Sequence, residues 1–208
     1  LDAAARVVYR SMSPTPQYVW PLLSAEVGAE VWVKHEDATP TGAFKVRGGL
    51  VYLDRLTRER PDVIGIASAT RGNHGQSLAF AGREHGVPVA IVVPKGNSVE
   101  KNAAMRGFGA DVIVHGADFQ ESREHAAVVA DERGYELVSP FHPDLVAGVA
   151  TYARELFDVS GELDVVYVPV GMGSGINCLI AVRDLLGLST EIVGVISDAA
   201  PATALSFD

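Results

Sequence analysis

The chain has 208 residues, of which 48% are hydrophobic, and a formal net charge of -9 at pH 7. The excess of acidic side chains argues against binding to nucleic acid or to an anionic membrane surface, because both carry negative charge. One cysteine excludes a disulfide framework and fits a reducing cytoplasm. No apolar run reaches membrane-spanning length, so we expect a cytoplasmic protein with a sizeable core.

Short apolar runs alternate with amphipathic stretches along the whole chain. The runs that predict strands lie at 31–35, 63–67, 87–93, 111–115, 163–169 and 191–196. The stretches that predict helices lie at 44–59, 73–85, 98–108, 118–133, 144–158 and 175–187. Continuous apolar strands are typical of parallel sheets that are covered on both faces. We therefore expect an α/β fold with two open, twisted, mostly parallel sheets and helices on both faces.

The first segment with a chemical signal follows the strand expected at 31–35. A loop rich in Thr, Pro and Gly leads to Phe44 and Lys45, at the expected start of a helix. Partial burial and a helix N-terminus both disfavour the ammonium form, so the pKa of Lys45 is expected to fall. A lysine with an accessible neutral amine can form a Schiff base with an aldehyde. Most lone lysines are solvated surface charges, so the interpretation depends on the surrounding residues.

The second segment connects the strand expected at 63–67 to the helix expected at 73–85. It reads Ser68-Ala69-Thr70-Arg71-Gly72-Asn73-His74-Gly75-Gln76. A strand that breaks into small residues and re-enters a helix exposes backbone N–H groups, and such a helix N-terminus binds anions. An ordinary strand-to-helix turn is the simpler alternative.

The third segment is a glycine-rich loop after the strand expected at 163–169. It reads Gly171-Met172-Gly173-Ser174-Gly175. Its glycines let the backbone turn sharply and bring N–H groups close to a phosphate. A dinucleotide-binding turn is an alternative, but the spacing is not Gly-x-Gly-x-x-Gly. The acidic residue after the next strand, Asp198, also has no partner motif.

Together the three segments resemble the fold-type II pyridoxal phosphate enzymes, and among them the serine/threonine dehydratase family of the tryptophan synthase beta superfamily. The dehydratase pattern is Lys-x-Glu-x-x-x-Pro-Thr-Gly-Ser-Phe-Lys-x-Arg-Gly. It matches here at Lys34, Glu36, Pro40, Thr41, Gly42, Phe44, Lys45, Arg47 and Gly48. Ala43 departs from it, because the family usually has a hydroxyl there. The other segments resemble the family's Ser-x-Gly-Asn-His loop and its tetraglycine loop, in which Met172 and Ser174 here replace glycines.

The resemblance implies a role for each segment. Phe44 and Lys45 bind pyridoxal 5'-phosphate, and Lys45 carries it as a Schiff base and then removes the α-proton of the substrate. Asn73 contacts the cofactor ring. The cofactor phosphate is held by the loop of Gly171, Met172, Gly173, Ser174 and Gly175. Thr70, Gly72 and His74 line the pocket for the substrate carboxylate, and Arg71 is a further candidate for substrate binding.

Arg71 is a departure within the second segment. Serine racemase has a serine at the corresponding position, which reprotonates the opposite face of the substrate. An arginine stays protonated near neutral pH, so we do not expect racemisation as the main activity. Arg71 either pairs with a second anionic group of the substrate or points to solvent.

The resemblance implies a pyridoxal phosphate-dependent lyase that eliminates the β-hydroxyl of a small hydroxy amino acid such as threonine or serine. The products are a 2-oxo acid and ammonia. A β-replacement or threonine synthase-type enzyme is the alternative with the same cofactor, and a non-catalytic nucleotide-binding α/β protein is the alternative outside that class. We expect a small amino-acid substrate, no metal site and, by analogy, a homodimer.

The family organisation also implies two lobes. Residues 1–64 and 143–208 are expected to form a large cofactor-binding lobe, and residues 65–142 a small lobe. In the dehydratases a serine near the C-terminus binds the pyridine nitrogen, and no residue up to Asp208 can be assigned to it. We therefore expect the C-terminal part of the large lobe to lie outside this chain.

Overall fold

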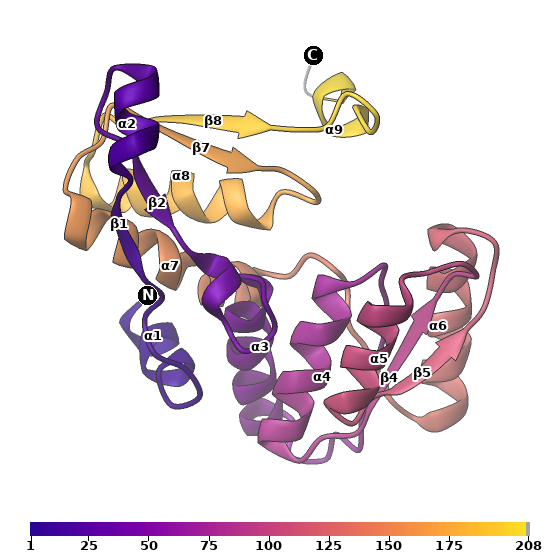
Figure 1. Cartoon of the computed structure of the whole chain (residues 1–208). Helices are drawn as coiled ribbons and strands as arrows, with labels where there is room; N and C mark the ends of the chain where they lie inside the picture. Colours follow the sequence, from indigo (N-terminus) through magenta and orange to yellow (C-terminus); the bar gives the residue numbers. More distant parts are fainter. Residues whose placement is uncertain (207–208) are drawn as a thin grey trace.

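The computed structural model describes residues 1–206 (Figure 1). Its strands are β1 (Gln17–Val19), β2 (Trp32–Lys34), β3 (Ile66–Ala69), β4 (Val89–Val93), β5 (Asp111–Val114), β6 (Glu136–Leu137), β7 (Val165–Pro169) and β8 (Glu191–Val195). Its helices are α1 (Asp2–Val8), α2 (Pro21–Val27), α3 (Lys45–Glu59), α4 (Asn73–His85), α5 (Val99–Gly107), α6 (Phe119–Arg133), α7 (Pro143–Ser160), α8 (Ser174–Leu186) and α9 (Ala202–Leu205), with a 3-10 turn η1 (Glu36–Ala38). Every predicted strand and helix overlaps an observed one.

The strands are mostly parallel. A four-stranded parallel sheet has the order β5–β4–β3–β6, and β7 pairs in parallel with β8. Strands β1 and β2 form a separate antiparallel pair. In Figure 1 the four-stranded sheet and α4–α6 occupy one part of the molecule, and β7, β8, α7 and α8 occupy another. The predicted α/β class with parallel sheets and helices is confirmed, and the antiparallel pair is an addition to it.

Helices cover both faces of the four-stranded sheet. Strands β3 and β4 are buried at every position, which explains their continuous apolar sequences. On one face, Ala67 packs in a cluster with Ala126 of α6. On the other face, Ile66 packs in a cluster with Leu78 of α4. Alternate residues of one strand therefore contact different helices, and this layer places the C-terminal end of β3 and the start of α4 together.

Helices α3 and α7 pack closely because glycines face each other's backbone. A Cβ atom added to Gly48 would lie 2.6 Å from the carbonyl oxygen of Leu145, and one added to Gly148 would collide with the carbonyl group of Arg47. Side chains at these positions would force the helices apart. Gly48 therefore fixes the position of α3 against α7. The same contact fixes the position of Lys45, the first residue of α3.

The helix boundaries agree with the prediction more closely than the strand boundaries. Helix α4 has the predicted limits, and it ends where Gly86 adopts a φ of 66°. The strand predicted at 63–67 instead begins at Ile66, three residues later. Within residues 1–206, no helix is both long enough and apolar enough to cross a membrane.

Candidate active site

Lys45 is the first residue of α3, and the loop before it is held by Thr39. The Thr39 hydroxyl accepts a hydrogen bond from Ala43 N at 2.9 Å and contacts the carbonyl oxygen of the same residue at 3.0 Å. Lys45 Nζ donates to Ser174 Oγ at 3.1 Å. Burial lowers the pKa of Lys45, which raises the fraction of neutral amine near neutral pH. The amine thus lies against the third segment, 129 residues away in the chain.

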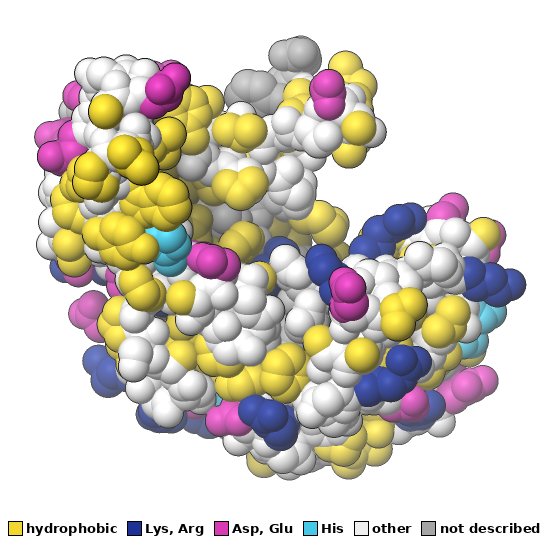
Figure 2. Space-filling view, viewed as in Figure 1, with side chains coloured by type: hydrophobic (Ala, Val, Ile, Leu, Met, Phe, Trp, Pro, Cys, Tyr) yellow, Lys and Arg dark blue, Asp and Glu magenta, His cyan; other side chains and the backbone are white. Residues whose placement is uncertain are grey.

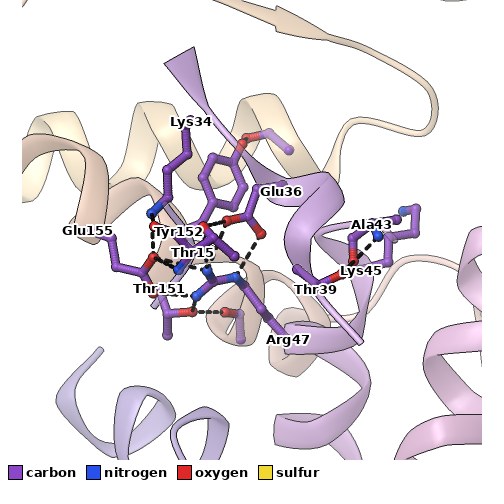
Figure 3. Close-up of polar contacts among 12 residues, drawn as sticks. Thr15, Lys34, Glu36, Thr39, Ala43, Lys45, Arg47, Thr151, Tyr152 and Glu155 are labelled. Atoms are coloured by element: carbon purple, nitrogen blue, oxygen red, sulfur yellow. Dashed lines mark hydrogen bonds and ion pairs between the residues drawn. The ribbon is translucent and has the colours of Figure 1, made fainter. Parts of the chain in front are cut away.

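The other charged residues of the same motif form a buried ion network. Arg47 has no exposed side-chain surface, and its Nε donates to Glu36 Oε2 at 2.8 Å. Arg47 Nη1 and Lys34 Nζ donate to the two carboxylate oxygens of Glu155, each at 2.5 Å. Figure 3 shows that Arg47 points into this network and that Lys45 points away from it. The motif therefore combines a candidate catalytic lysine with residues that hold its backbone.

Mutual hydrogen bonds keep the network charged in spite of its burial. Burial by itself raises the pKa of Glu155, but hydrogen bonds from Arg47, Lys34 and Tyr9 outweigh it and lower the pKa below the usual value. Burial by itself lowers the pKa of Arg47. The hydrogen bonds to Glu155 and Glu36 outweigh burial, so the pKa of Arg47 is raised above its usual value. No sequence motif pointed to Glu155, which lies within α7.

The loop between β3 and α4 presents free backbone donors. Thr70 Oγ1 accepts hydrogen bonds from Gly72 N at 2.9 Å and from Gly75 N at 3.3 Å, which fixes the shape of the loop. The backbone N–H groups of Arg71, Asn73 and His74 donate no hydrogen bond within residues 1–206. Unpaired donors at the N-terminus of a helix favour an anion such as a carboxylate.

The loop between β7 and α8 presents a second set of free donors. Gly173 has a φ of 90°, a conformation that favours glycine. The N–H groups of residues 171–176 donate to no group within the described part of the chain. Ser174 is buried, and its hydroxyl contacts Lys45 Nζ. A lysine amine beside a cradle of free amides fits pyridoxal phosphate, whose aldehyde and phosphate need these two partners.

One cavity of about 440 Å³ connects the three segments. Figure 2 shows the hollow between the two parts of the molecule. The predicted site residues in its lining are Lys45, Thr70, Arg71, Gly72, Asn73, His74, Gly171 and Met172. Lys101, Phe119 and Pro140 also line it, and no sequence motif identified them.

Phe44 is not among the residues that line this cavity, and its role at the cofactor stays a prediction. Its ring packs against Tyr152, with 5.8 Å between the ring centroids, and Lys45 Nζ lies 5.3 Å from the Phe44 centroid. A Cβ added to Gly175 would contact the Phe44 ring at 3.5 Å. Phe44 and Gly175 therefore pack against each other outside the lining of this cavity.

Among residues 1–206, no three His, Cys, Asp or Glu side chains are grouped to hold a metal ion.

The side chain of His74 is buried and neutral. The Ser68 hydroxyl donates to Val138 O at 2.8 Å, so its oxygen accepts from His74 Nε2 at 3.2 Å. This assigns the proton to Nε2 and leaves Nδ1 as an acceptor. Burial, with a further contribution from the charge of Lys45, lowers the pKa of His74 to about 3. The imidazole therefore carries no charge at neutral pH.

Because of His74, the protein is expected to lose stability in mild acid. The pKa of His74 is about 3 in the folded protein, against an ordinary value of 6.5, so the unfolded chain binds more protons between these pH values. Lowering the pH from 7 to 5 should cost about 2 kcal/mol through this group. Urea unfolding at both pH values would measure it in the wild type and in His74→Gln, whose amide keeps a donor for Ser68. An equal pH dependence in the two proteins would contradict the assignment.

An open parallel α/β fold in which a partly buried lysine amine lies at the N-termini of two helices is typical of the fold-type II pyridoxal phosphate enzymes. The chain belongs to the pyridoxal-phosphate dependent enzyme family, whose model matches residues 8–208. It is 39% identical over 176 residues to the biosynthetic L-threonine dehydratase of Salmonella typhimurium, covering 84% of this chain and 34% of that protein.

Two further similarities support the same family. The chain is 32% identical over 196 residues to the L-threo-3-hydroxyaspartate ammonia-lyase of Saccharomyces cerevisiae, covering 94% of this chain and 60% of that protein. The structure of maize serine racemase is similar with a TM-score of 0.91 and 25% identity, covering 99% of this chain and 62% of that one. The predicted family is confirmed, and the non-catalytic nucleotide-binding alternative is not supported. The chain spans less than two thirds of the length of each of these proteins.

Proposed function

We propose that the protein containing this chain is a pyridoxal phosphate-dependent lyase that eliminates the β-hydroxyl of a small hydroxy amino acid, such as threonine or serine. The observation that carries the proposal is the contact of Lys45 Nζ with Ser174, which puts the amine beside the cradle of free amides at the cavity. The dehydratase and ammonia-lyase described above favour elimination over β-replacement or threonine synthesis. Arg71 argues against racemisation as the main activity, because it does not exchange a proton near neutral pH.

In this proposal the residues of the chain orient the substrate and move its α-proton. Bound pyridoxal phosphate would supply an electron-poor ring that stabilises negative charge on the α-carbon. The free N–H groups of Arg71, Asn73 and His74 would bind the α-carboxylate and fix the direction of the α-C–H bond. Lys45 Nζ, oriented by Ser174, would take the α-proton. The β-hydroxyl leaves as water, and the unsaturated amine then takes up water and releases ammonia, so one amino acid gives one 2-oxo acid and one ammonia.

The remaining assignments follow the resemblance. The side chain of Asn73 would contact the cofactor ring, and the amides of residues 171–175 would hold the phosphate. The lobes would be 1–64 with 143–208, and 65–142, a division supported by the position of β3–β6 between these boundaries. A cytoplasmic location is supported by the single cysteine, and a homodimer by analogy with other fold-type II enzymes.

An assay of the full-length protein with pyridoxal phosphate tests this function. With L-threonine and L-serine we expect ammonia and the matching 2-oxo acid in equal amounts. Formation of the D-enantiomer without ammonia would identify a racemase. Consumption of substrate only when a second nucleophile is added would identify a β-replacement enzyme, and either result would contradict the proposal.

A further inference from the structure

The cavity that contains Lys45 has more positive charge than one carboxylate requires. Three cations line it, Lys45, Arg71 and Lys101, and no Asp or Glu is in the lining. None of the three forms an ion pair with an acidic side chain within residues 1–206. The chain has 26 acidic and 17 basic residues, so acidic partners are not scarce in general. The cavity is therefore a selectively cationic place in an acidic protein.

Lys101 reaches the loop between β3 and α4 from another element. It belongs to the first turn of α5, where its backbone N–H donates to the Ser98 hydroxyl at 3.2 Å. Its side chain lies over Gly72, since a Cβ added to Gly72 would be 2.9 Å from Lys101 Nζ. A side chain at position 72 would displace the end of the lysine side chain. The Lys101 ammonium consequently lies against the loop that presents the free N–H groups.

The two cations beside this loop exceed what a monocarboxylic substrate needs. In the proposed function Lys45 serves the cofactor and the α-proton, and the loop at residues 171–175 holds the phosphate. The free N–H groups of the loop between β3 and α4 would bind the α-carboxylate. Arg71 and Lys101 then remain as charged donors in the same cavity. A second carboxylate on the substrate would pair with both, in charge-assisted hydrogen bonds.

We propose that Arg71 and Lys101 form a subsite for a second substrate carboxylate, so that the preferred substrates are β-hydroxy amino acids with an acidic side chain, of the 3-hydroxyaspartate class. This inference rests on the proposed function, since it names the substrate of the same site. In such a substrate the second carboxylate is attached to the carbon that carries the leaving hydroxyl. Its binding group must therefore lie next to the α-carboxylate loop, as Arg71 and Lys101 do.

The test compares kcat/KM for L-threo-3-hydroxyaspartate and for L-threonine in the full-length holoenzyme. We expect the wild type to prefer hydroxyaspartate, and Arg71→Gln and Lys101→Gln each to lower that preference by about 10- to 100-fold. Arg106→Gln is the matched control. Arg106 also lies on α5, but it does not line the cavity and its side chain donates to Val112 O at 3.5 Å, so both kcat/KM values should stay at the wild-type level.

Three results would overturn the subsite. A preference for threonine in the wild type would do so, and so would an equal loss for both substrates, because the two cations would then serve the α-carboxylate. A loss of preference in Arg123→Gln alone would move the subsite to the adjoining cavity that Arg123 lines.

A binding measurement separates this inference from the proposed function. Succinate and butyrate have four carbons each and differ by one carboxylate, and neither can lose a hydroxyl. We expect the holoenzyme to bind succinate more tightly than butyrate, and Arg71→Gln and Lys101→Gln to reduce the difference by about 10-fold. Absence of ammonia from every hydroxy amino acid would refute the lyase, whereas equal binding of succinate and butyrate would refute the subsite.

Discussion

Replacing Lys45 by alanine is expected to lower kcat for ammonia release by about 10⁴-fold or more. The change removes both the amine that would bind the cofactor and the base that would take the α-proton. The visible absorbance band of the bound cofactor should disappear as well. Ammonia release from L-threonine and the absorbance spectrum of the full-length protein measure the two effects.

Two variants make this result interpretable. Lys95→Ala removes an exposed lysine from the turn after β4, and we expect wild-type activity. Lys45→Arg keeps a positive charge at the start of α3 but has no amine that exchanges with an aldehyde, so it should be as inactive as Lys45→Ala. Retention of more than a tenth of the activity in Lys45→Ala would refute the role of this lysine.

Replacing Glu155 by alanine is expected to reduce the free energy of unfolding by about 3–5 kcal/mol. The variant removes the shared acceptor of Arg47 and Lys34, which leaves Arg47 with Glu36 as its remaining acidic partner and Lys34 with no acidic partner among residues 1–206. Tyr9 also loses its acceptor, at 2.6 Å. Urea unfolding at pH 7, followed by circular dichroism, measures the change.

Asp158→Ala is the matched control for the ion network. Asp158 lies one turn further along α7 and pairs with Arg154, and both side chains are well exposed. An exposed pair of this kind contributes less than about 1 kcal/mol. If Glu155→Ala lowered the free energy of unfolding no more than Asp158→Ala does, the buried network would not be what holds α3 and the start of the site in place.

The regular part of the fold was predictable from local patterns. Strands β3 and β4 are continuous apolar runs because they are buried on both faces, and α4 ends at a glycine in the left-handed region. The three loops of the site were also predictable, since each follows a strand and begins a helix. Their convergence on one cavity was not predictable in this way, because β2, β3 and β7 belong to three different sheets.

The missed features depend on short elements or on contacts between distant residues. Strands β1 and β6 have three and two residues, too few for a periodic pattern. Glu155 is 108 residues from Arg47, and nothing around it distinguishes it from other helical acids. Lys101 resembles an ordinary surface lysine until α5 is placed beside Gly72.

Borohydride reduction of the full-length protein with pyridoxal phosphate, followed by peptide mass spectrometry, tests the central claim most directly. Reduction makes the bond between the cofactor and its lysine permanent. We expect the cofactor on the peptide that contains Lys45. Its attachment instead to Lys101, the other amine in the cavity lining, or to no lysine at all, would contradict the proposed site.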